Sequence, residues 1–133
     1  MLPIDVETVR LFLHVLAAAV WVGGQIVLGA LVPVLRRAGA DVPRSAARQF
    51  GRIGWTAFAV LVLTGFWNLA EYDETSRSGF PATIAVKLVF VVLSGIAAFV
   101  HQQATSRAAL AAGGAAALVF SLGALFFGIV LTG

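Results

Sequence analysis

Four long apolar runs constrain this chain more than any other feature of its sequence. A helix that crosses a bilayer needs about 20 mainly apolar residues. Of the 133 residues, 60% are hydrophobic and only 11% are charged. The apolar runs cover residues 11–35, 53–70, 82–100 and 108–133. Because the connections between them are short and polar, we predict one domain over residues 1–133: an all-α integral membrane protein in which four transmembrane helices form a bundle in the lipid bilayer.

The charged residues at the ends of these runs predict an orientation. The first connection carries Arg36, Arg37, Arg44, Arg48 and Arg52, and the third carries Arg107. The second carries Glu71, Asp73 and Glu74 against Arg77. Lys and Arg are enriched in cytoplasmic loops, so the first and third connections are predicted to be cytoplasmic, with the N-terminus and C-terminus both extracytoplasmic. This pattern predicts a multi-pass protein of a bacterial-type inner (plasma) membrane. The same arginines account for the net charge of +3, so this charge does not indicate binding to nucleic acid.

Three further features bear on the architecture. Pro33 lies near the end of the first apolar run, where it predicts a kink or the end of the helix. Residues 38–52 are polar and rich in arginine, so they form either a short helix on the membrane surface or a solvated loop. Trp55 and Trp67 lie near opposite ends of the second run, which is typical of an aromatic belt. The chain has no cysteine, which excludes thiolate metal sites and covalent haem attachment.

Two ionisable residues inside the apolar runs are the main candidates for function. His14, Trp21 and Gln25 recur at a spacing that places them on one stripe of the first helix. Lys87 lies in the third helix, and Asn68 near the outer end of the second. Charged or titratable groups within membrane helices usually face the bundle interior and mark functional sites. We therefore predict that His14 and Lys87 share a level near the outer leaflet, with Asn68 close to them.

Each candidate also has a structural interpretation that involves no ligand. His14 can donate a hydrogen bond to a neighbouring carbonyl, and Lys87 can extend its amine to the headgroups. Gln25 can tie two helices together by a hydrogen bond. His101 lies at the cytoplasmic end of the third helix, on the order of 20 Å from His14 at 1.5 Å per residue. We therefore interpret His101 as an interfacial residue, and we do not expect one haem to be held by both histidines of one chain.

The fourth run carries small residues at four-residue spacing. Small residues at this spacing let membrane helices approach closely. Such a face packs either inside one bundle or against a homodimer partner or another membrane subunit. The stripe consists of Gly113, Ala117, Ser121, Ala124 and Gly128.

Short motifs in the first three runs resemble a known family. Residues 13–24, LHVLAAAVWVGG, resemble the first helix of the copper resistance protein D (CopD) family membrane domain. Residues 62–68, VLTGFWN, resemble the next helix of that family, and Lys87-Leu88 fits the start of the one after. The pattern His14, Trp21, Gly24 and Lys87 is also similar to the related HemJ-type protoporphyrinogen oxidases. The first resemblance implies copper movement across the inner membrane. The second implies a membrane protein that contains haem b, in which the histidine and the lysine matter.

Three functions follow as hypotheses. The first is a site for haem b or a porphyrin, with a redox or electron-transfer role. In it His14 is the metal ligand, and Trp21, Gln25, Asn68 and Lys87 contact the cofactor. The second is copper binding or transport through His14. It lacks soft ligands, because Met1 is the chain's single methionine and there is no cysteine. The third is a non-catalytic subunit of a larger membrane complex, so whether the chain is an enzyme stays open.

Overall fold

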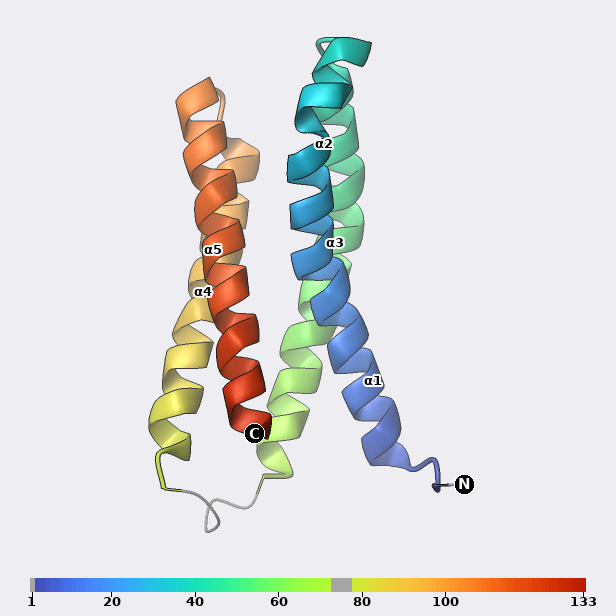
Figure 1. The fold of residues 1–133 in the computed structure, drawn as a ribbon, viewed down its shortest axis with the longest axis vertical. Helices are drawn as coiled ribbons and strands as arrows, with labels where there is room; N and C mark the ends of the chain where they lie inside the picture. The colour runs from blue at the N-terminus through green and yellow to red at the C-terminus, as the bar shows by residue number, and fades with distance from the viewer. Residues whose placement is uncertain (1, 73–77) are drawn as a thin grey trace. The chain divides into compact units, whose positions relative to one another are not determined.

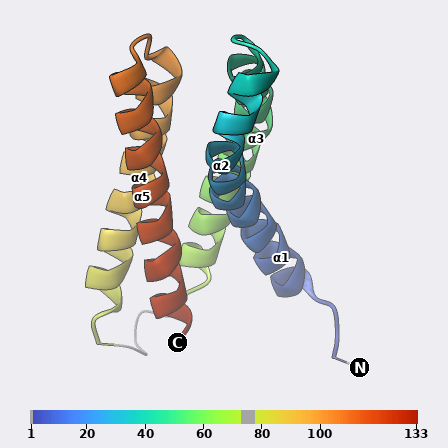
Figure 2. The same cartoon turned by 45° about the horizontal axis from the view of Figure 1, so that its top comes forward.

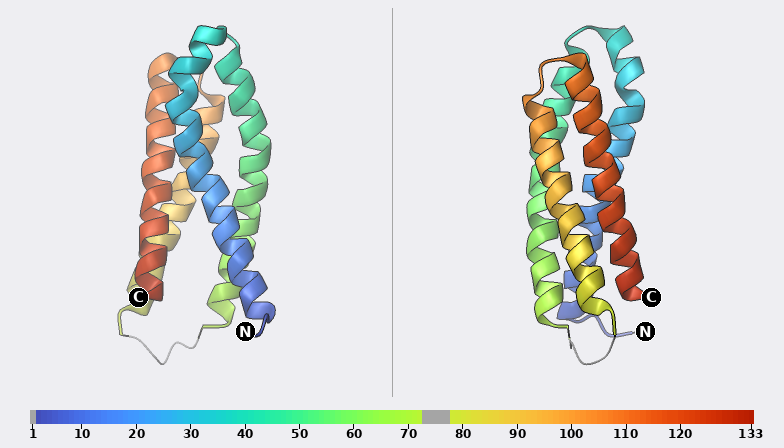
Figure 3. Two further views of the ribbon diagram at one scale, coloured as in Figure 1. Left: turned by 45° about the vertical axis from the view of Figure 1, so that its right-hand side comes forward. Right: turned by 90° about the vertical axis from the view of Figure 1, so that its left-hand side faces the viewer.

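A computed structural model describes residues 2–72 and 78–133, and every regular element in these residues is a helix (Figure 1). The chain divides into two compact units, Met1–Tyr72 and Asp73–Gly133, and we describe each by itself. The N-terminal hairpin consists of the helices in the first unit, and the C-terminal hairpin of those in the second (Figures 2 and 3). The elements are α1 (Val6–Ala18), the π-helical turn η1 (Ala19–Gly23), α2 (Gly24–Ala38), α3 (Val42–Ala70), α4 (Phe80–Gln103) and α5 (Arg107–Thr132).

Four helical segments of the described residues are long and apolar enough to span a membrane. They are Val6–Ala38, Val42–Ala70, Phe80–Gln103 and Arg107–Thr132, with mean hydropathies of 2.1, 1.5, 2.4 and 2.3. The prediction of an all-α, multi-pass membrane protein is therefore confirmed. The side of the membrane that each terminus faces stays a prediction, and Asp73, Glu74 and Arg77, on which it partly depends, lie outside the described residues.

The arginine-rich segment 38–52 is neither a separate surface helix nor a loop. It enters α3 at Val42, and three residues, Gly39–Asp41, separate α2 from α3. Pro43 lies in the first turn of α3, where its fixed φ favours a helix and its missing N–H costs nothing. Arg44, Arg48 and Arg52 recur every four residues, so this helix places them on one face. The cationic segment is thus a continuous extension of the second membrane helix.

Of the two alternatives predicted for Pro33, the end of the helix is wrong, because α2 continues through Pro33 to Ala38; a kink at Pro33 stays a prediction. The irregularity lies further towards the N-terminus, in the π-helical turn η1. There the Nε2 of Gln25 donates a 2.9 Å hydrogen bond to the backbone carbonyl of Trp21. A π-turn disturbs the regular pattern of backbone bonds, and the Gln25 amide supplies an extra donor to it.

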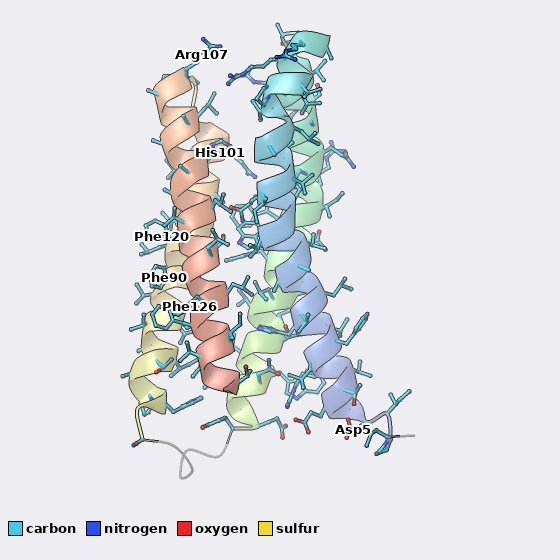
Figure 4. The ribbon with its side chains drawn as sticks, in the orientation of Figure 1. Asp5, Phe90, His101, Arg107, Phe120 and Phe126 are labelled. Atoms are coloured by element: carbon cyan, nitrogen blue, oxygen red, sulfur yellow. The ribbon has the colours of Figure 1, made fainter. Side chains whose placement is uncertain are left out.

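Asp5 caps the first turn of α1 (Figure 4). Its Oδ1 accepts hydrogen bonds from the Thr8 backbone N–H and the Thr8 hydroxyl, both at 2.8 Å. The backbone bond and then the hydroxyl bond lower the pKa of Asp5 below its ordinary value. A lowered carboxyl pKa stabilises the folded turn above the unfolded-state pKa, and this stabilisation is lost as pH falls through the folded-state value.

We therefore expect Asp5→Ala to lower the hydrogen-exchange protection factor of the Thr8 amide at neutral pH. In wild type the same protection should fall as the Asp5 carboxyl is protonated in acid. The two proteins should then converge. NMR hydrogen exchange at several pH values measures this effect, and equal Thr8 protection in both proteins at neutral pH would contradict the cap.

Small residues bring α4 and α5 together in the C-terminal hairpin. Ser94 on α4 is 2% exposed, and Ser121 on α5 is 1% exposed. The Ser94 hydroxyl donates to the Val91 carbonyl at 2.9 Å, so its polar group is satisfied within its own helix. A Cβ added at Gly113 would lie 3.0 Å from the Cα of His101. The backbones therefore approach closely at this point.

The small-residue stripe predicted on the fourth helix contacts α4 at both of its ends. Gly113 lies against His101, and Gly128 lies against the side chain of Lys87. Between them, Ala117 and Ser121 are buried and Ala124 is half-buried. These contacts support the interpretation that the stripe packs inside the chain. A homodimer or partner subunit on this stripe stays a prediction.

Candidate functional site

His14 on α1 is bonded to Thr64 on α3, fifty residues away in sequence. Its Nδ1 lies 2.8 Å from the Thr64 Oγ1. Thr64 is 6% exposed and His14 is half-buried. The bond therefore joins the two spans of the N-terminal hairpin at the level where sequence spacing predicted a site.

The surroundings of Thr64 favour one tautomer of His14. The Thr64 hydroxyl donates to the Val60 carbonyl at 2.7 Å, with the Leu61 carbonyl at 3.2 Å as a further acceptor. Since a hydroxyl has one hydrogen and the Val60 carbonyl is in reach of it, the geometry favours the arrangement in which Thr64 accepts from His14, whose Nδ1 is then protonated. In the neutral imidazole, Nε2 consequently carries the lone pair. This is the form in which histidine ligates a metal, with its other nitrogen held by a neighbour.

Gly65 lies beside one edge of the His14 imidazole and has no side chain to cover it. A Cβ at Gly65 would lie 3.5 Å from the His14 Cε1, which is van der Waals contact. Cε1 is the ring atom between the two nitrogens. A side chain larger than alanine at position 65 would therefore crowd the imidazole at Cε1.

Trp21 is the centre of an aromatic cluster in the N-terminal hairpin. Its ring centroid lies 5.4 Å from that of Trp55 and 4.6 Å from that of Phe58. Trp21 is 4% exposed, and its Nε1 has no hydrogen-bond partner among the described residues. Sequence analysis placed Trp21 with His14 on the stripe of α1, but it missed the packing on α3. Trp55, which was assigned to an aromatic belt, contributes to this packing.

Asn68 lies one helical turn beyond Thr64 on α3 and is half-buried. Its Oδ1 is buried and has no hydrogen-bond partner in the part of the chain that the structure describes. Asn68 and Thr64 share a helix face, so the amide lies on the side of α3 that contacts α1. The position of Asn68 close to His14 stays a prediction.

Arg10 is a buried cation that sequence analysis missed. It lies one turn before His14 on α1, is 9% exposed, and its Nε has no hydrogen-bond partner among the described residues. Its Nη2 lies 3.7 Å from the Glu7 carboxylate. Arg10 also lines a cavity of about 390 Å³ with Glu7, Glu71 and Trp67. Glu7 pairs with its charge, and its position four residues before His14 was the available signal.

Lys87 belongs to the C-terminal hairpin, where it lies across Gly128 of α5. Its Nζ would be 3.4 Å from a Cβ at Gly128, so this glycine makes room for the lysine side chain. Lys87 is half-buried. His14 and Lys87 are in different units, and the convergence of their side chains stays a prediction.

His101 makes a structural contact in the C-terminal hairpin (Figure 4). Its Nδ1 donates to the Leu110 carbonyl of α5 at 2.8 Å, and its ring lies 3.2 Å from where a Gly114 Cβ would be. The bond spans the connection between α4 and α5. His101 therefore joins the two helices at the end opposite to Lys87.

The described residues contain no group of three or more His, Cys, Asp or Glu side chains arranged to hold a metal ion. Comparison with known protein families, characterised proteins and solved structures finds no match for this chain. The candidate site is therefore defined by its own geometry, which is a histidine held by a threonine of the neighbouring membrane helix.

Proposed function

We propose that this chain is an inner-membrane protein that binds haem b, or a related porphyrin, through Nε2 of His14 and has a redox or electron-transfer role. The observation that carries the proposal is the hydrogen bond from His14 Nδ1 to Thr64 Oγ1. This bond orients the imidazole and, with the Val60 carbonyl as the acceptor for Thr64, favours the tautomer with a proton on Nδ1, as the outer-shell partners of metal-ligating histidines do. The resemblance to HemJ-type proteins at His14, Trp21 and Lys87 supports the same assignment.

The donor set favours a porphyrin over a bare metal ion. A porphyrin supplies its own ring nitrogens, so the protein needs to add only axial ligands. A copper ion would need several protein ligands, and soft thiolate or thioether ligands suit Cu(I). Apart from Met1 the sequence offers none, and no ligand cluster exists among the described residues. Copper transport therefore has no structural observation in its favour.

The candidate residues have separate roles in this proposal. Bound haem would supply the one-electron chemistry, while the protein sets its axial ligand and surroundings. Thr64 holds His14, and Gly65 places no side chain against the His14 Cε1. Trp21 rigidifies the hairpin behind the site through its contacts with Trp55 and Phe58. Lys87 would pair with a propionate, and the buried Asn68 amide offers a hydrogen-bonding group near the His14 level.

The direct test is a visible spectrum with metal analysis of protein purified in mild detergent from haem-replete cells. We expect a Soret band, a pyridine haemochrome spectrum of haem b, and iron rather than copper. No Soret band, either as purified or after haem addition, would end the proposal. Copper retained in place of iron would favour the transport hypothesis, and stable co-purification with a larger complex without any cofactor would favour the subunit hypothesis.

The role of Thr64 predicts a graded effect. Thr64→Val keeps the shape of the side chain but removes the acceptor for His14 Nδ1–H, so haem affinity should fall by about 10- to 100-fold. Thr64→Ser should retain the affinity. Thr56→Val is the matched control, because the Thr56 hydroxyl also bonds a carbonyl of its own helix, that of Arg52, but not His14. Equal haem affinity for the Thr64→Val and Thr56→Val proteins would contradict the positioning role.

A further inference from the structure

A second concave surface lies between the two spans of the N-terminal hairpin. It is a groove of about 440 Å³, lined by residues of α1, η1 and α3. Leu13 and Val60 line it towards one end, and Val20 and Ile53 towards the other. The rise from Leu13 to Val20 is about 10 Å along the helix. Apart from Arg52 and Thr56 its lining is aliphatic, and it contains no histidine, so it differs from the His14 site.

Arg52 gives this groove one charged end. It precedes the apolar run 53–70, and it is the innermost of the three arginines that α3 places on one face. No carboxylate of the described residues lies within 4 Å of its guanidinium, since the ion pair found among them is that of Arg10 and Glu7. The Thr56 hydroxyl donates a hydrogen bond to the Arg52 carbonyl. The Thr56 side chain therefore offers no free donor to the aliphatic part of the groove.

We propose that this groove binds one anionic phospholipid, with its phosphate on Arg52 and part of an acyl chain between α1 and α3. A basic group at the headgroup level above an apolar groove is complementary to such a lipid, and basic pockets between membrane helices bind anionic headgroups. A second copy of this chain is a poorer occupant, because it would take the exposed Arg52 out of water, and Arg52 has no acidic partner among the described residues of its own chain. The site is independent of any cofactor on His14.

Native mass spectrometry of the full chain in mild detergent tests the proposal. The probes are dioleoyl phosphatidylglycerol and dioleoyl phosphatidylcholine, added separately at matched concentrations. We expect one tightly bound phosphatidylglycerol and at least about fivefold weaker binding of phosphatidylcholine, the ratio that corresponds to about 1 kcal/mol for one basic residue at the membrane surface.

Two variants separate the charged end from the groove. Arg52→Gln should weaken phosphatidylglycerol binding by about fivefold, and Val60→Phe should weaken both lipids by filling the groove. Arg48→Gln is the matched control, since Arg48 has the same charge one turn earlier on α3, does not line the groove, and bonds the Ser45 hydroxyl at 3.2 Å.

Three results would overturn the proposal. They are equal binding of the two lipids to wild type, equal losses in the Arg52→Gln and Arg48→Gln proteins, and wild-type lipid binding in the Val60→Phe protein. A dimer that dissociates on Val60→Phe while lipid adducts persist would assign the groove to a second copy of the chain instead.

Discussion

Replacing His14 with alanine is expected to abolish haem binding. The substitution removes the proposed axial ligand, so the loss of affinity should exceed the roughly 100-fold that is the upper range for partners outside the first ligand shell. A haem titration followed at the Soret band measures it. Added imidazole should restore part of the band, because the alanine leaves space for a free ligand beside Gly65.

His101→Ala is the control for this experiment. It removes the other histidine of the chain, whose Nδ1 is bonded to the Leu110 carbonyl of α5, and it should leave haem affinity within about twofold of wild type because the lost bond contributes only about 1 kcal/mol to stability. The secondary structure of both variants is checked by circular dichroism. Haem retained in the His14→Ala protein, or lost only in the His101→Ala protein, would contradict the assignment of the ligand.

The membrane helices could be predicted from the sequence because lipid requires every backbone polar group to be satisfied within the span. Their ends could not. The apolar run 11–35 marks the part of the first helix that lipid would cover, whereas the helix extends over Val6–Ala38. The difference is largest at α3, where hydropathy suggested a start near residue 53 and the helix begins at Val42. Arginines at four-residue spacing are compatible with a helix, but a hydropathy profile scores them only as polar residues and does not mark the segment as helical.

The depth of the site along the first two spans could be predicted from the sequence, but the contacts between its side chains could not. Counting residues placed Asn68 near the level of His14, and Thr64, which bonds His14, lies one turn before Asn68. The Trp21–Trp55 contact depends on how α1 and α3 are rotated about their axes, and on the π-turn between Ala19 and Gly23. A π-turn shifts every later side chain around the helix, so a stripe drawn with a uniform 3.6-residue period loses its accuracy beyond Trp21.

Hydrogen bonds carry information that spacing lacks. Gln25 was expected either to tie two helices together or to touch a ligand, and its amide donates to the Trp21 carbonyl within its own span. His14 was expected to meet a carbonyl or a ligand, and its Nδ1 meets a hydroxyl. A hydroxyl that already donates elsewhere can only accept, and this chemistry is invisible to hydropathy or spacing.

The close approach of α4 and α5 predicts a large effect of bulk at Gly113. Here the neighbour of an added Cβ is the backbone of His101, at 3.0 Å from its Cα and 3.4 Å from its amide nitrogen, and a backbone cannot rotate away as a side chain can. Gly113→Leu should therefore destabilise the C-terminal hairpin by about 3 kcal/mol, the upper range for overpacking, and Gly113→Ala by less. Ala115→Leu is the matched control, because Ala115 is exposed on the same helix.

Spin labels on cysteines introduced at Val92 and Val119 report this effect during titration with a denaturing detergent. Both positions are more than half exposed, and the chain has no cysteine of its own to compete for the label. We expect the distribution of distances between the labels to broaden at a lower detergent fraction in the Gly113→Leu protein than in wild type or in the Ala115→Leu protein. If the transitions of the Gly113→Leu protein and wild type coincided, the two helices could not be held together by a glycine contact at this position, and the small-residue stripe of α5 would then be available to a partner.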